Sequence, residues 1–262
     1  MLRGAWRFVR ALWARLGRDE VGTYASALTY NLLFALGPLA LTVAAIVPVG
    51  QQRTLLLPLS AVVSPEVIAL LQRGAGAQVR GALAWAGAAG YVWGMSAAFR
   101  RLLEAISRAY EEPLPRRRGA RARWLLSGVL AVTLGVLLLL AMAVATAGQY
   151  LAPLVAGASA ATALAVLRWG VLLAIAVIML AVLYAVGPDR GRPLRWLSPG
   201  AVTAITAWLL LSWGFSRYLA HFNAYNLVYG SVGAVILLLL YLYFLGYALL
   251  LGAEINGMLG VR

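Results

Sequence analysis

The chain has 262 residues, of which 63% are apolar and only 11% are charged, and its formal net charge is +14. Soluble domains carry about a quarter charged residues, so this composition excludes an ordinary soluble protein and predicts a polytopic membrane protein. All of the basic residues are arginine and there is no cysteine, which excludes disulfides, thiolate metal sites and a cysteine nucleophile.

Residues 1–20 have the pattern of an amphipathic helix, which we separate from a six-helix domain at 21–262. The apolar side chains recur at helical spacing, and most of the arginines fall on another side of the helical wheel. The apolar set is Leu2, Trp6, Val9, Trp13 and Leu16, and the basic set is Arg3, Arg7, Arg10 and Arg18. Such a helix lies in the membrane interface. It is not expected to be a cleaved signal peptide, because no uninterrupted apolar region follows its first charges.

The first membrane span is predicted at about 24–49, and its N-terminal half is unusually polar. Five residues of this half share one helical face, namely Thr23, Ser26, Ala27, Tyr30 and Asn31. We expect this stripe to face the protein interior, because unsatisfied polar groups in lipid are costly. The candidate residues of a substrate path here are Tyr24, Ser26, Tyr30 and Asn31. The alternative is that the stripe only joins helices through hydrogen bonds.

Residues 50–80 are predicted to form a surface-lying or re-entrant insert. Ser64, Pro65 and Glu66 form a good helix start, with a capping hydroxyl, a proline at the first position and a carboxylate at the positive end. A short extracytoplasmic helix is therefore expected to run to about Gln72.

The second span is predicted at about 81–98, with small residues at every fourth position. Gly90 and Gly94 form a GxxxG pair that lets another helix approach closely, within the subunit or in a homo-oligomer. The helix is expected to continue past the membrane to Arg108. There, Glu104 lies four residues from both Arg100 and Arg108, which permits ion pairs.

Four further spans are predicted at about 124–147, 164–186, 198–218 and 233–253. The entry to the last one is polar, with Asn226, Tyr229 and Ser231 as candidate path residues, and Gly230 and Gly233 permit a helix break there. Glu254 ends this span. We place it at the headgroup level, as a partner for the basic inner face formed with Arg100, Arg101 and Glu104.

The arginines predict the orientation of the chain. With the N-terminus in the cytoplasm, 17 of the 22 arginines lie inside and 5 outside. This split follows the positive-inside rule, so both termini are expected in the cytoplasm. The expected fold is all-α: six transmembrane helices, an N-terminal interfacial helix and a short extracytoplasmic helix.

Three blocks of the sequence resemble the YihY/virulence-factor BrkB family. They are TYASALTYNLLFALGPL from Thr23, WGMSAAFRRLLEAISRAYEEP from Trp93, and YGSVGAVILLLLYLYFLGYALLLGAEIN from Tyr229. The resemblance covers about residues 20–257. It implies a six-helix bacterial inner-membrane protein without a settled activity, in a family linked to serum resistance and envelope lipid phenotypes. It also implies that an old ribonuclease label on part of the family is a misassignment.

The residues argue against enzymatic chemistry. The chain has one histidine and eight acidic residues, none at metal-ligand spacing, so we expect no metal, no cofactor, no ribonuclease activity and no nucleic-acid partner. His221 with Ser212 or Ser216 could form a hydrolase pair on helical spacing, but we favour an interfacial histidine bonded to water or backbone.

A transporter or lipid-handling protein for an anionic envelope lipid is the function that the sequence favours. Arg100 and Arg101, just past the second span, are suited to a phosphate headgroup. The competing hypothesis is a non-transporting envelope scaffold that binds partners through the GxxxG face. A polar cavity between the first and sixth spans would favour transport, and a dry bundle with an exposed GxxxG face would favour the scaffold.

Overall fold

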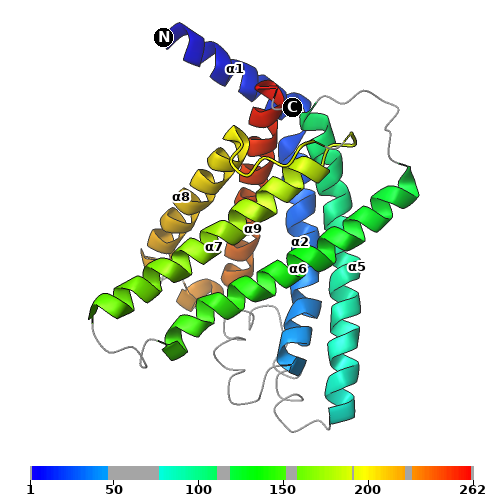
Figure 1. Cartoon of the computed structure of the whole chain (residues 1–262), viewed down its shortest axis with the longest axis vertical. Coiled ribbons are helices and arrows are strands. Elements are labelled where there is room, and N and C mark those ends of the chain that lie inside the picture. The colour runs from blue at the N-terminus through cyan, green and yellow to red at the C-terminus, as the bar shows by residue number, and fades with distance from the viewer. Residues whose placement is uncertain are drawn as a thin grey trace.

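A computed structural model describes residues 2–46, 77–110, 119–151, 158–190, 192–221 and 226–260. Within these ranges the secondary structure is entirely helical (Figure 1). The helices are α1 (Leu2–Arg18), α2 (Val21–Ile46), α5 (Ala77–Ala109), α6 (Ala120–Leu151), α7 (Ala158–Val186), α8 (Pro199–His221) and α9 (Asn226–Met258).

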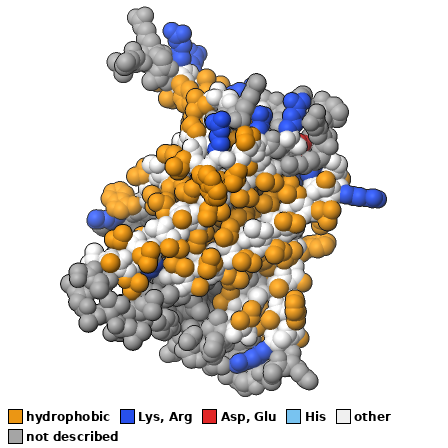
Figure 2. Space-filling model, in the orientation of Figure 1, with side chains coloured by type: hydrophobic (Ala, Val, Ile, Leu, Met, Phe, Trp, Pro, Cys, Tyr) orange, Lys and Arg blue, Asp and Glu red, His pale blue; other side chains and the backbone are white. Residues whose placement is uncertain are grey.

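The six long helices pack side by side in an order that differs from the chain order. α9 lies between α8 and α2, α2 lies against α5, and α6 joins α5 to α7. α1 projects from the end of this bundle at which α2 begins and α9 ends (Figure 1). We call this end the α1 end. It gathers exposed arginines, and an apolar belt occupies the face below it (Figure 2).

Each predicted span corresponds to a helix. Four helices contain a segment long and apolar enough to cross a membrane, at 21–43, 120–141, 162–186 and 235–258. The remaining two long helices, α5 and α8, do not meet that criterion. α5 consists largely of small residues and ends in charged ones, and α8 carries several polar side chains, so neither gives a strong hydropathy signal.

Two predicted details differ from the structure, and a third concerns residues that the structure does not describe. α6 continues to Leu151 and α7 begins at Ala158, so their connection is shorter than the predicted 148–163, because alanine-rich sequence extends the helices. α9 is helical from Asn226 onward, so the predicted break at Gly230 and Gly233 is wrong. The predicted helix at 64–72 lies outside the described residues.

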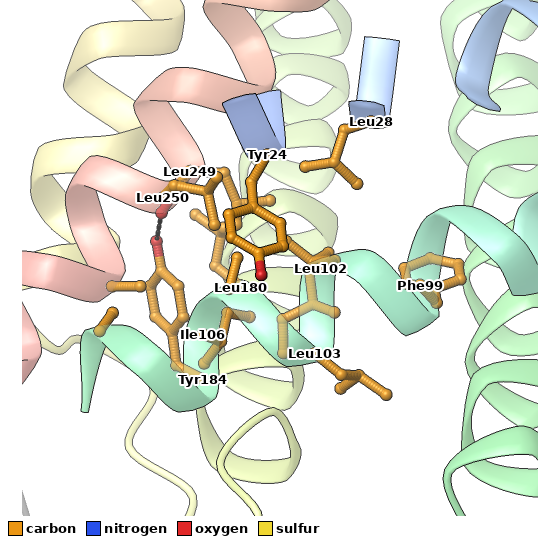
Figure 3. Packing of buried hydrophobic residues seen from close by; sticks show 14 of the residues in the cluster. Tyr24, Leu28, Phe99, Leu102, Leu103, Ile106, Leu180, Tyr184, Leu249 and Leu250 are labelled. Carbon is orange, nitrogen blue, oxygen red and sulfur yellow. Dashed lines mark hydrogen bonds between the residues drawn. The ribbon is translucent and has the colours of Figure 1, made fainter. Parts of the chain in front are cut away.

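The core is densest near the α1 end, where side chains from α2, α5, α7 and α9 meet (Figure 3). Ile106, Leu180 and Leu250 are fully buried there. The buried Tyr184 hydroxyl donates a hydrogen bond to the Leu249 carbonyl oxygen at 2.7 Å, which ties α7 to α9. This packing gives the α1 end a fixed frame.

A buried asparagine joins α8 to α9 at the same end. The Asn256 Oδ1 accepts a hydrogen bond from the Gly200 backbone N–H at 2.8 Å, and its Nδ2 donates to the Ser198 Oγ at 3.0 Å. Ser198 also caps α8, because its Oγ accepts the Ala201 N–H at 3.2 Å. The backbones of Gly200 and Gly252 touch where the helices cross, so neither position has room for a Cβ.

The GxxxG pair of α5 faces α2 within the same chain. A Cβ on Gly90 would lie 3.1 Å from Pro38, and one on Gly94 would lie 3.6 Å from Ala35. The small-residue stripe therefore serves the α2–α5 contact, so its close-packing face is already occupied.

Candidate functional site

An open pocket of about 480 Å³ lies between α2, α5 and α6 toward the α1 end. Its lining consists of three arginines, one acid, one amide and two alanines: Arg100, Arg101, Arg123, Glu104, Asn31, Ala97 and Ala120. We call it the arginine pocket. It brings together Asn31 of the predicted polar stripe and three members of the predicted inner-face charge set, which the sequence alone did not connect.

Arg100 is held over an aromatic ring. Its guanidinium carbon lies 3.9 Å from the centre of the Trp124 ring on α6, a cation–π distance that links α5 to α6. Burial, and secondarily the charge of Arg101, lower the pKa of Arg100 from its ordinary value. The guanidinium group of arginine stays protonated in proteins, so the side chain is charged.

Glu104 partly balances the positive charge of the pocket. Its carboxylate lies 3.8 Å from Arg101 and 3.7 Å from Arg108, and Arg108 also lies 3.5 Å from Glu20. The Glu104–Arg108 pair confirms the predicted spacing. Three arginines against one acid leave the pocket with a net positive charge.

Two arginine donors at this pocket are buried and unsatisfied. The Nη1 of Arg100 and the Nε of Arg123 have no hydrogen-bond partner among the described residues. Buried charged donors without partners are costly, and an oxyanion with several oxygens is the ligand that pairs with guanidinium groups most favourably. The arrangement is therefore suited to a phosphate or carboxylate group.

The four predicted path residues of α2 do not lie together. Tyr24 is buried in the core, with Arg108 5.2 Å from its ring centre, and only Asn31 lines the arginine pocket. The expectation that the stripe faces the interior is wrong for Thr23, Ser26 and Tyr30, which are exposed. The Ser26 hydroxyl donates to the Gly22 carbonyl oxygen at 2.9 Å, and so it is satisfied within its own helix. The ring of Tyr30 packs on Phe34.

The side chains predicted at the entry to α9 are not described. Asn226, Tyr229, Gly230 and Ser231 belong to α9, but their side-chain environments lie outside the described residues, whereas Gly233 is half-buried.

Glu254 is buried, with only 1% of its surface exposed, and the sequence did not predict this burial. It lies four residues before the end of α9 at the α1 end, so its placement at the headgroup level stays a prediction. Asp19, Arg15 and Arg18, at the end of α1, lie close enough to the carboxylate to interact with it. The start of α2 and the end of α1 cover the last turns of α9, which a reading of single helices could not predict.

Sequence reasoning missed Arg123, which lines the pocket, and Trp124, whose ring lies under the guanidinium of Arg100. α5 and α6 are consecutive helices, so residues at equal distances from their connection tend to meet. Arg100 and Trp124 are equidistant from position 112, as are Arg101 and Arg123. This symmetry is the signal that could have identified them.

Comparison with known proteins places the chain in a family. Residues 12–262 match the family model described as virulence factor BrkB. YfkH of Bacillus subtilis (strain 168), described as ribonuclease-like, is 39% identical over 98 residues, which are 37% of this chain and 36% of that protein. A UPF0761 membrane protein of Xanthomonas campestris pv. campestris (strain B100) is 34% identical over 83 residues, which are 32% of this chain and 20% of that protein.

These alignments span about a third or less of the lengths of the curated relatives, and no solved structure matches the chain. The family model, in contrast, extends over nearly all of the sequence. The protein is therefore a helical membrane protein that belongs to the virulence factor BrkB family.

Proposed function

We propose that this protein binds the anionic headgroup of an envelope lipid in the arginine pocket and moves that lipid across the membrane. The observation that carries the proposal is the pair of buried, unsatisfied donors on Arg100 and Arg123 at one positively charged pocket. A phosphate group has enough oxygen atoms to accept hydrogen bonds from both guanidinium groups.

The position of the pocket supports a lipid as the ligand. Arg100 lies nine residues before the end of α5, or about 13 Å along the helix axis, and Arg123 lies near the start of α6. Both arginines thus lie in the part of their helices nearer the α1 end, which the proposed topology places toward the cytoplasmic headgroups. A site between helices at this depth is open to lipids of the same leaflet, and basic pockets between transmembrane helices bind anionic headgroups in other proteins.

We further propose that α2, α5, α6, α7, α8 and α9 each cross a bacterial inner membrane. In this topology α1 lies in the interface and both termini are cytoplasmic. The exposed Trp6 and Trp13 give α1 an apolar face for the interface. The two poorly apolar helices, α5 and α8, are long enough to cross, with 33 and 23 residues.

The absence of cysteine permits a direct test of this topology. Gln51→Cys, in the segment that the sequence places outside, is expected to react with an impermeant maleimide on intact cells. Arg195→Cys, in the α7–α8 connection, is expected to react only after the cells are permeabilised. The reverse pattern would contradict the orientation.

We also propose that the protein acts without covalent chemistry. The word ribonuclease-like describes the Bacillus relative, and this chain supplies few groups for hydrolysis, with one histidine and eight acidic residues. The scaffold alternative loses its main support, because the GxxxG face of α5 already packs on α2.

Equilibrium binding tests the headgroup site. Purified protein in neutral detergent is titrated with a short-chain phosphatidate and, separately, with a short-chain phosphatidylcholine. Arg123→Ala is expected to weaken phosphatidate binding about tenfold or more, because a hydrogen bond to a charged group contributes about 1.5–3 kcal/mol.

Arg121→Ala is the matched control. Arg121 lies on the same helix two residues away, and it is exposed and does not line the pocket. This variant is expected to bind phosphatidate within about twofold of wild type, because exposed ion pairs contribute little. Equal losses in the two variants would indicate attraction by surface charge alone, and no loss in Arg123→Ala would refute the site.

A further inference from the structure

A second pocket, of about 430 Å³, lies in the middle of the bundle. All six long helices contribute side chains to it, and the lining is mostly leucine, methionine and aromatic rings. We call it the central chamber. α5 forms a wall between the two pockets, because Ala97 and Arg101 line the arginine pocket whereas Ala98 and Phe99 line the chamber.

The chamber begins at the level of the arginine pocket and extends further from the α1 end. Its α9 residues run from Tyr241 to Leu249, which are 17 and 9 residues before the end of α9 at Met258. At 1.5 Å per residue, the chamber extends from about 13 to about 25 Å from the α1 end. The far part of this range, about 25 Å from the α1 end, corresponds to the hydrocarbon core of a membrane.

One hydroxyl in the chamber lacks a partner. The Tyr91 Oη is buried and forms no hydrogen bond with any described residue. The other polar groups are satisfied, since the Ser212 and Tyr241 hydroxyls lie 3.0 Å apart and the Trp208 Nε1 donates to the Leu245 carbonyl oxygen at 2.9 Å. Tyrosine hydroxyls usually find a partner when they are buried, so this donor points to an acceptor that the protein itself does not supply.

The sequence also makes room for the Tyr91 ring. A Cβ on Gly135 of α6 would lie 2.7 Å from the Tyr91 Cε1 and 2.9 Å from its Oη. A larger side chain at position 135 would clash with the Tyr91 ring, so glycine there allows the Tyr91 hydroxyl to occupy its position against α6. An apolar cavity with a few converging polar groups is the usual form of a small-molecule site, and this one is about three times the volume of an apolar cavity that binds benzene.

We propose that the central chamber is an intermediate site on the lipid path. It binds an acyl chain, and Tyr91 donates a hydrogen bond to the ester carbonyl oxygen of that chain. A lipid at rest keeps its ester groups near the interface, so a hydrogen-bond donor at this depth serves a lipid that is crossing. The inference rests on the proposed function and names the acyl ester region as the part of the lipid that the protein recognises at mid-membrane.

An uncharged probe tests binding in the central chamber independently of binding in the arginine pocket. Radiolabelled monoacylglycerol has one acyl chain, one ester and no charge, and it is titrated onto purified full-length protein in detergent. Leu138→Trp, at a chamber-lining position on α6, is expected to weaken binding at least tenfold by filling the space. Leu140→Trp is the matched control, because Leu140 is similarly exposed on the same helix but does not line the chamber.

Tyr91→Phe tests the hydrogen bond without a change of shape. We expect it to weaken monoacylglycerol binding about fivefold and to leave the binding of hexadecane, which has no acceptor, unchanged. Tyr218→Phe, at an exposed position outside the chamber, is expected to match wild type with both probes.

The outcomes distinguish the two proposals. Arg123→Ala is expected to bind monoacylglycerol as wild type does, so failure of the headgroup site leaves this result intact. Equal binding by Leu138→Trp and Leu140→Trp would refute the chamber site, as would the absence of saturable monoacylglycerol binding to wild type. Equal losses of both probes in Tyr91→Phe would refute the ester contact.

Discussion

The buried polar side chains of this protein fall into two groups that call for different explanations. Asn256 and Ser198 are hydrogen-bonded to each other and to the backbone of α8, and they join two helices. Arg100, Arg123 and Tyr91 instead hold buried donors that no described residue satisfies. Satisfied buried groups contribute to stability, whereas unsatisfied ones reduce it unless a ligand supplies the missing partner. Function is therefore expected in the second group.

Asn256→Ala tests the first group. The variant loses the bonds to Gly200 and Ser198 and leaves the buried Gly200 N–H without its acceptor. We expect the free energy of unfolding in mixed micelles to fall by about 2–4 kcal/mol. Ser216→Ala, which removes an exposed hydroxyl bonded within its own helix, is expected to change it by less than about 0.5 kcal/mol. Asn256→Ala protein that remains folded should bind phosphatidate normally, and a selective loss of binding would contradict a structural role.

Among the helices, the closest approach depends on glycine. Gly200 of α8 and Gly252 of α9 bring their backbones into contact, and the Tyr184 hydroxyl lies beside Gly252. This crossing holds α8 and α9 together at the α1 end of the bundle, next to the buried Asn256. Small residues of this kind are how membrane helices gain packing where no hydrophobic effect drives their association.

Gly252→Ala is expected to disrupt this crossing. Its Cβ would overlap the Gly200 carbonyl oxygen and the Tyr184 hydroxyl, so the helices must separate and the folded yield should fall sharply. Gly214→Ala on α8 is the control, because nothing lies within 4 Å of its Cβ and alanine favours a helix by about 0.5–1 kcal/mol. Size-exclusion profiles and thermal unfolding of the two variants provide the comparison, and equal stability would contradict the close crossing.

Most of the helices could be predicted from the sequence, because long uncharged runs and arginine-rich connections mark their ends. Which individual side chains face the interior of the protein could not be predicted so reliably. Ser26 and Tyr30 share a helical face with Asn31, yet only Asn31 lines the arginine pocket. Serine satisfies its hydroxyl on its own backbone, so a polar stripe does not by itself identify the interior face.

For the whole molecule, the distribution of charge was predictable, whereas the site that it forms was not. Arginines gather at the α1 end above an apolar belt (Figure 2). Which of them meet depends on how α5 and α6 pair, and that pairing brings Arg123 to Arg100 across the hairpin. The burial of Glu254 likewise depends on α1 and α2 covering α9, which is a tertiary effect.

Lipid movement in proteoliposomes tests the central claim most directly. Vesicles carry a fluorescent phosphatidylglycerol in both leaflets, and an impermeant quencher measures its exchange between them. The account predicts faster exchange with wild-type protein than in empty vesicles. It also predicts at least a tenfold loss for the Arg100→Ala/Arg123→Ala variant and an unchanged rate for Arg121→Ala. Exchange no faster than in empty vesicles, or equally fast with the double variant, would contradict it.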